Sequence, residues 1–195
     1  MWDFVTIVSG LPRSGTSLMM QMLAAGGMPV LTDGIREADE DNPRGYFEFE
    51  PVKRTKQDAA WVTEAQGKAV KMVYLLLREL PSEYQYRVIL MRRDLREVIA
   101  SQKAMLQRTG RKGAALSDER IAAIFEEELR ETTAWLAVQK NFTVLQAEHR
   151  ECLRTPSVVA SKVNAFLGGG LDEAAMARVV EPSLYRRSSS SAVLS

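Results

Sequence analysis

The residues with the clearest chemical pattern lie near the N-terminus, in the stretch IVSGLPRSGTSLMMQML from Ile7 to Leu23. Gly10 and Gly15 enclose four residues and are followed by two hydroxyl residues, Thr16 and Ser17. Glycines at these positions allow backbone N–H groups to turn inward around an anion, and a helix beginning here would add the positive end of its dipole. The stretch therefore predicts a phosphate-binding loop.

This loop lacks the lysine of ATP- and GTP-binding loops, because Thr16 occupies that position and the only cation in the loop is Arg13. In nucleoside-triphosphate hydrolases the lysine reaches the β- and γ-phosphates, and the next hydroxyl holds Mg²⁺. An arginine instead offers a rigid fork of donors. The pattern favours an oxyanion such as phosphate or sulfate as the ligand.

A second group of cations follows the apolar run YRVILM, which predicts a strand at 86–91. Arg93 lies just beyond the carboxyl end of that strand, where ligands bind in open parallel sheets. Arg92, Arg93 and Arg96 stand at the start of the next expected helix, where positive charge opposes the helix dipole. A bound anion would remove this conflict, so we interpret Arg93 as an anion-binding residue. Ser101 falls on the same helix, about two turns further along.

With both motifs in view, GLPRSGTSL resembles the 5′-phosphosulfate loop of sulfotransferases that use 3′-phosphoadenosine 5′-phosphosulfate (PAPS), and its PRSGT form is similar to that of tyrosylprotein and related bacterial enzymes. Arg93 and Ser101, eight residues apart after a strand, are similar to the family's second signature, which binds the 3′-phosphate. The resemblance covers about Phe4 to Gln107. Further along, FTVLQAEHRECLRTPSVVASKVNAFLGG is similar to the family's last strand and helix, with the acidic strand-end motif degraded to QAEHREC.

The resemblance implies transfer of a sulfuryl group from PAPS, as co-substrate, to a hydroxyl or amine, with no metal required. Arg13 would stabilise the bridging and leaving oxygens as a catalytic residue. The residues implied for nucleotide binding are Leu11, Pro12, Arg13, Ser14, Gly15, Thr16 and Ser17 for the 5′ end, and Arg93 and Ser101 for the 3′-phosphate.

A catalytic base is also expected, because the acceptor must lose a proton. Asp33 sits close to the position where tyrosylprotein-type relatives carry their glutamate, and Glu48, in NPRGYFE, belongs to a stretch associated with bacterial members. Both are candidates, with Asp33 ahead. His149, the single histidine, does not lie where the family's histidine occurs and is interpreted as a surface or structural residue.

Strands alternating with helices predict an α/β fold: a three-layer sandwich with a mainly parallel central sheet and a topology like that of P-loop nucleotide hydrolases. One domain is expected over 1–185, followed by a Ser-rich, disordered tail at 186–195. The expected strands are 4–9, 29–31, one beginning at 69, 86–91 and 143–146, and the expected helices are 17–25, 51–64, 95–107, 117–140, 156–167 and 172–180.

Charge and composition exclude several classes of protein. The 195 residues carry 26 Lys and Arg against 25 Asp and Glu, so no bulk field would draw the chain to nucleic acid or an anionic membrane. The single cysteine, Cys152, allows no intrachain disulfide and suits a reducing compartment. The N-terminus reads as a first strand rather than a signal peptide, and no apolar run approaches the length of a membrane span. A cytoplasmic protein is expected.

Two other functions stay open at this point. A P-loop kinase or nucleotide hydrolase would use Asp94 as a metal-binding acid, although the absent lysine argues against it. A non-catalytic module would bind 3′-phosphorylated adenosine without transferring a group. The acceptor, whether small molecule, sugar, lipid or peptide, is also open. The basic stretch RTGRKG, from Arg108 to Gly113, is expected to be a solvated loop.

Overall fold

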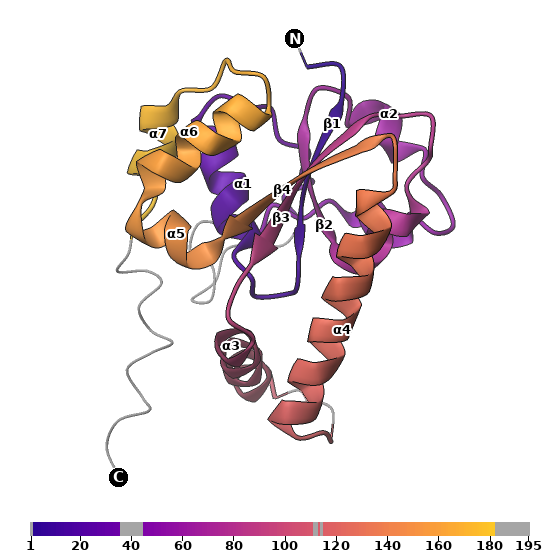
Figure 1. Cartoon of the computed structure of the whole chain (residues 1–195), viewed down its shortest axis with the longest axis vertical. Helices are drawn as coiled ribbons and strands as arrows, with labels where there is room; N and C mark the ends of the chain where they lie inside the picture. Colours follow the sequence, from indigo (N-terminus) through magenta and orange to yellow (C-terminus); the bar gives the residue numbers. More distant parts are fainter. Residues whose placement is uncertain (1, 36–44, 111–112, 114, 182–195) are drawn as a thin grey trace.

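The computed structural model describes residues 2–35, 45–110, 113 and 115–181. Within these residues a four-stranded sheet has the order β2-β1-β3-β4, and every neighbouring pair is parallel (Figure 1). The strands are β1 (Val5–Gly10), β2 (Ala69–Val73), β3 (Tyr86–Arg92) and β4 (Phe142–Glu148). The predicted α/β fold with a parallel central sheet is confirmed.

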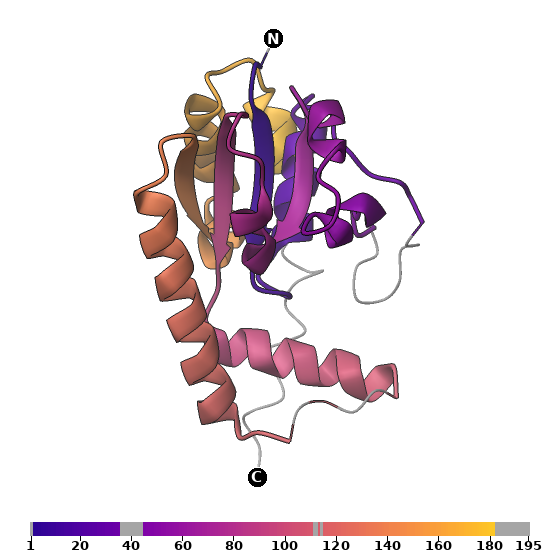
Figure 2. The ribbon, with the colours of Figure 1, turned by 90° about the vertical axis from the view of Figure 1, so that its right-hand side faces the viewer.

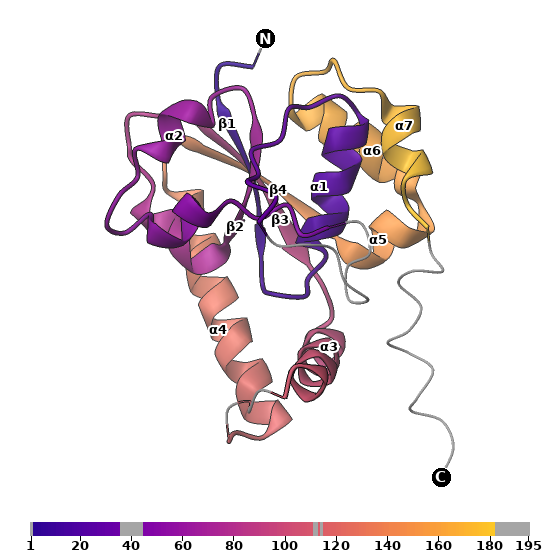
Figure 3. The same cartoon turned by 180° about the vertical axis from the view of Figure 1, so that it is seen from behind.

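Helices cover both faces of the sheet and form the outer layers of the predicted sandwich. On one face lie α1 (Thr16–Ala25), α5 (His149–Arg154), α6 (Pro156–Phe166) and α7 (Glu173–Arg178), with α1, α6 and α7 side by side in Figure 3. The other face packs against η1 (Glu50–Arg54), α2 (Trp61–Glu64), η2 (Tyr74–Glu79), α3 (Leu95–Arg108) and α4 (Asp118–Ala137).

The sheet separates two hydrophobic cores because successive side chains of a strand point to opposite faces. In β1, Val8 contributes to the core beneath α1, whereas Ile7 contributes to the core beneath α2 and α4. Ile89 and Val88 of β3 divide in the same way. All six residues of the strand VTIVSG are buried, as is typical of a parallel sheet covered on both faces.

The order of the strands creates a switch point between β1 and β3. From β1 the chain crosses through α1 to β2 on one side, while β3 lies on the other side and leads towards β4. Ligands in open α/β sheets bind beyond the carboxyl ends of the strands at such a point. Figure 2 shows α3 crossing beneath these carboxyl ends, with α4 running alongside the sheet.

Three local predictions differ from the structure. Residues 29–31 form no strand, because the pairing with β2 is limited to one isolated bridge between Val30 and Ala69. Beyond it, the Thr32 hydroxyl and the Asp33 N–H both donate to the Glu48 carbonyl. The expected helix at 51–64 is interrupted between η1 and α2, where the Asp58 carboxylate accepts from the Ala60 N–H in a competing turn. Conversely, HRECLR forms α5, which was not expected.

The tail at 186–195 and part of the RTGRKG stretch lie outside the described residues. In the described part of the chain, no helix combines the length and apolar character needed to cross a membrane.

Candidate functional site

The loop between β1 and α1 has left-handed backbone positions directly before the first turn of a helix. Arg13 has a φ of 70° and Gly15 a φ of 98°, both in the left-handed region. The first bond of α1 runs from the Met19 N–H to the Gly15 carbonyl at 3.2 Å, so the N–H groups of Thr16 and Ser17 precede it. Within the described residues, no side chain caps this helix. The loop therefore has the geometry of an anion-binding nest.

The two glycines of the loop are required by close neighbours. A Cβ at Gly10 would lie 2.6 Å from the Ser14 Oγ and 2.8 Å from the carbonyl oxygen of Met91. A Cβ at Gly15 would lie 2.5 Å from the Cδ2 of His149. The Ser14 hydroxyl is buried and has no hydrogen-bond partner in the described part of the chain. An oxyanion in the loop fits these residues, because its oxygens can accept from the N–H groups and hydroxyls that the loop and the start of α1 provide.

Replacing Gly10 by alanine is expected to lower the free energy of unfolding by about 3 kcal/mol or more, since backbone strain is added to overpacking against a carbonyl that cannot rotate away. Gly27 provides the matched control: its φ is +92°, but a Cβ there would meet no described atom within 4 Å. Gly27→Ala should cost only about 1 kcal/mol, for the positive φ alone. Urea unfolding of both variants measures the difference, and equal losses would mean that the contacts at Gly10 are unimportant.

The two predicted anion-binding motifs contact each other directly. The Arg93 Nη1 donates to the Arg13 carbonyl at 3.0 Å, and the Arg13 Nε donates to the Ser101 Oγ at 2.9 Å. These contacts join positions 80 and 88 residues apart in the sequence. The loop after β1 and the start of α3 after β3 therefore form one site at the switch point of the sheet.

The arginine-rich start of α3 is partly balanced within the protein. The Arg93 Nε forms an ion pair with the Glu97 carboxylate at 2.9 Å. Asp94 caps the helix, accepting from the Arg96 N–H at 2.8 Å. The carboxylate considered as a metal-binding acid of a kinase thus serves as an N-cap here. In the described residues, no group of three or more His, Cys, Asp and Glu side chains has the arrangement of a metal site.

The strand register brings His149 to the same site. Arg92 pairs with Glu148 across β3 and β4, so Arg93 and His149 each follow the carboxyl end of neighbouring strands. The His149 side chain is only 3% exposed and its ring lies against Gly15. Burial, together with the positive charge of Arg93, lowers the pKa of His149 to about 4. The imidazole is consequently neutral at neutral pH.

The two carboxylates predicted as possible bases have different environments. Glu48 lines the cavity, with Lys71 of β2 3.8 Å and Lys53 of η1 3.5 Å from its oxygens. Asp33 is exposed and does not line the cavity. The N–H groups of Ile35 and Glu50 donate to its carboxylate and hold the pKa of Asp33 below its usual value. Of these two carboxylates, only Glu48 shares a cavity with the loop that the sequence predicts to bind phosphate.

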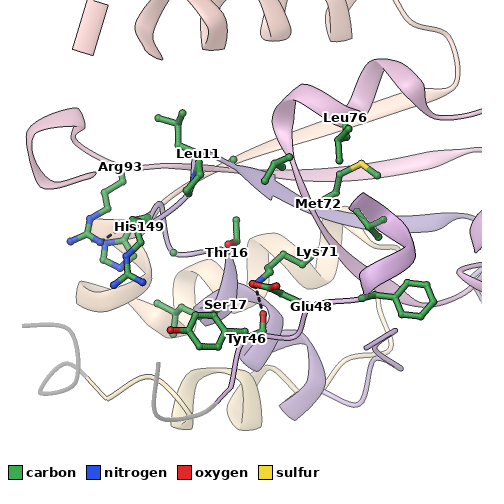
Figure 4. A pocket seen from close by; sticks show the side chains of 18 of the residues that line it. Leu11, Thr16, Ser17, Tyr46, Glu48, Lys71, Met72, Leu76, Arg93 and His149 are labelled. Carbon is green, nitrogen blue, oxygen red and sulfur yellow. Dashed lines mark hydrogen bonds and ion pairs between the residues drawn. The ribbon is translucent and has the colours of Figure 1, made fainter. Parts of the chain in front are cut away.

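The cavity itself has a volume of about 300 Å³ and a polar and an apolar end. Figure 4 shows Arg93 and His149 together at one end and Met72 and Leu76 at the other, with Lys71 and Glu48 in between. The Lys71 ammonium donates to the Tyr46 carbonyl and lies 5.7 Å from the centre of the Tyr46 ring. Such a space could hold an anionic group at one end and an apolar body at the other.

Most residues predicted from the sequence meet at this cavity, and some lie behind its surface. Leu11, Pro12, Arg13, Gly15, Thr16, Ser17, Arg93 and Glu48 line it, whereas Ser14 and Ser101 do not, and Ser101 contacts the lining through Arg13. Lys71 and His149 were not predicted as part of the site. A lone charge in the apolar run AVKMV was the available signal for Lys71, and the position directly after a parallel strand was the signal for His149.

Comparison with known proteins supports the fold. No model of a protein family matches this chain, and no curated protein is significantly similar to it. The solved sulfotransferase domain from the Synechococcus PCC 7002 olefin synthase is similar over 94% of this chain and 86% of that chain, with a TM-score of 0.55 and 15% identity. The sulfotransferase domain from the curacin biosynthetic pathway matches 87% of this chain and 75% of that chain, with a TM-score of 0.52 and 16% identity. The chain thus has the fold of these sulfotransferase domains, as the sequence resemblance implied.

Proposed function

We propose that this protein is a sulfotransferase that moves a sulfuryl group from PAPS to a hydroxyl or amine of an acceptor. The observation that supports this most directly is the contact of Arg13 with both residues of the second motif, Arg93 and Ser101. A 5′-phosphosulfate site and a 3′-phosphate site must lie within reach of one nucleotide, and these contacts join the two motifs. The fold shared with two sulfotransferase domains agrees with the proposal.

In this proposal the loop binds the 5′ end of the nucleotide and Arg93 binds its 3′-phosphate. The N–H groups and hydroxyls of Thr16 and Ser17 would donate to the 5′-phosphate, and Ser101 would complete the 3′ side. PAPS, when bound, supplies the sulfuryl group. Arg13 would neutralise negative charge on the oxygens released by the transfer, because a guanidinium fixed in the loop need not reorganise during the reaction.

Glu48 is the base that we propose for the acceptor. Its carboxylate would take the proton from the acceptor hydroxyl or amine, which increases the nucleophilicity of that atom. The flanking ammonium groups of Lys71 and Lys53 lie 3.8 and 3.5 Å from its oxygens and restrict the orientation of the carboxylate. The apolar end of the cavity, near Met72 and Leu76, would receive the body of the acceptor.

Calorimetric titration tests the nucleotide assignment without an acceptor. Wild-type protein is expected to bind 3′-phosphoadenosine 5′-phosphate more tightly than ATP. Arg93→Ala should lose about tenfold or more of this affinity, because a hydrogen-bonded charge pair is removed. Its affinity for adenosine 5′-phosphosulfate, which has no 3′-phosphate, should change little.

Arg96→Ala is the matched control, since Arg96 belongs to the same helix start but is exposed and does not line the cavity. Equal affinity for ATP, or an Arg93→Ala protein that binds like wild type, would exclude the proposed 3′-phosphate site. Tight Mg²⁺-dependent ATP binding would instead support a kinase or hydrolase. Binding of the 3′-phosphorylated nucleotide without transfer to any acceptor would support a binding module.

A further inference from the structure

His149 lies where its ring both fills space against the loop and reaches the cavity. It is the first residue after β4, and the register of β3 with β4 makes it the neighbour of Arg93 at the edge of the sheet. It is buried against Gly15 of the loop, yet it also lines the cavity. Figure 4 shows its ring beside Arg93 at the polar end. The imidazole therefore packs on the loop, lies beside Arg93 and faces the cavity.

The chemistry of this end of the cavity favours a neutral donor. Arg13 and Arg93 already bring two positive charges to the lining of the cavity, and a third cation would add repulsion before a ligand binds. A neutral imidazole carries one N–H donor and one acceptor nitrogen. It can add a hydrogen bond to an oxyanion without adding charge. Burial and the charge of Arg93 keep His149 in this neutral form.

We propose that His149 is a ligand-binding residue of this site and donates a hydrogen bond to the same phosphate that Arg93 binds. The inference rests on the proposed function, because that phosphate is the 3′-phosphate of the nucleotide. His149 would then distinguish nucleotides with a 3′-phosphate from those without one. The ring also supports Gly15, and the experiment must separate this packing from the hydrogen bond.

The first measurement uses the wild-type protein and the fact that the chain contains a single histidine. In tag-free protein, imidazole signals in a ¹H–¹⁵N NMR spectrum belong to His149 without any assignment. Addition of 3′-phosphoadenosine 5′-phosphate should shift the ring ¹⁵N signals by several parts per million, as expected when the N–H group gains an ionised acceptor. Adenosine 5′-phosphate should shift them far less.

The second measurement uses two substitutions of similar shape. His149→Met fills the space beside Gly15 with a flexible apolar side chain, and His149→Gln fills it with an amide that can donate. In calorimetric titrations, His149→Met should bind 3′-phosphoadenosine 5′-phosphate about tenfold more weakly than wild type, and His149→Gln should recover most of the affinity. The affinity of both variants for adenosine 5′-phosphate should stay within about twofold of wild type.

The outcomes separate this inference from the proposed function. If wild-type protein does not bind the 3′-phosphorylated nucleotide, the proposed function fails and the role of His149 fails with it. If wild type binds but the His149 signals do not move, or move equally with adenosine 5′-phosphate, only the role of His149 is overturned. Equal weakening of both nucleotides in His149→Met would likewise assign His149 to the packing of the loop. Where a variant does not fold, the wild-type NMR result decides.

Discussion

Arg13→Ala is expected to lower the rate of sulfuryl transfer by about 10²- to 10³-fold, as is typical when one positioned donor that stabilises developing charge is removed. Arg13 is the only cation in the loop, and its guanidinium is held by Ser101 at the edge of the cavity. The loss should appear in kcat, because the charge to be stabilised develops during transfer. Steady-state kinetics with PAPS and an active acceptor measures the effect.

Two comparisons make the Arg13 result specific. Arginine and alanine both have a Cβ, so the φ of 70° at this position costs about the same conformational energy in wild type and in Arg13→Ala. We therefore expect the substitution to change the stability of the fold little through backbone preference. Arg13→Lys restores a positive charge without the fork of donors and should recover part of the rate. A rate in Arg13→Ala within about threefold of wild type would contradict the role proposed for this arginine.

Glu48→Gln is expected to reduce kcat by about 10²-fold or more, since general-base catalysis typically contributes at least that factor. The amide preserves the size of the side chain but cannot accept the proton. The affinity for 3′-phosphoadenosine 5′-phosphate should remain close to wild type, because Glu48 lies away from the arginine end of the cavity. Turnover and calorimetry on the same preparation measure the two quantities.

The same measurements on Asp33→Asn test the other candidate base. The two backbone N–H groups that hold the pKa of Asp33 below its usual value also make its carboxylate a weaker base. We therefore expect a much smaller effect on turnover than from Glu48→Gln. A large loss in Asp33→Asn together with normal turnover in Glu48→Gln would reverse the assignment, and normal turnover in both would exclude both carboxylates.

The sequence predicted those parts of the site that depend on local backbone chemistry. The glycine spacing and the hydroxyl pair predicted a loop between a strand and a helix, and both elements are present as β1 and α1. Arg93 was predicted because a cation directly after a strand, at the start of a helix, breaks a local electrostatic rule. In the structure it reaches the loop through the Arg13 carbonyl. These signals are contained in a few neighbouring residues.

Features that depend on the packing of distant segments could not be predicted in the same way. Asp33 and Glu48 look alike in an acidic stretch, and only the path of the chain past β2 brings Glu48 between Lys53 and Lys71. His149 was interpreted as a surface or structural residue, because nothing near it in sequence indicates that its ring packs on Gly15. That contact follows from the register of β4 against β3, which the composition of either strand does not specify.

The packing of His149 on Gly15 also affects the order in which the site is built during synthesis. The loop, Arg93 and Ser101 all leave the ribosome before β4, which becomes an edge strand of the sheet only after the long helix α4 has been made. Domains generally acquire their structure from the N-terminus as the chain emerges. A nascent chain interrupted before residue 149 therefore contains both arginines but lacks the side chain that lies against the loop glycine. Among the described strands β4 is made last, and His149, directly after it, completes a site whose loop follows the first strand, β1.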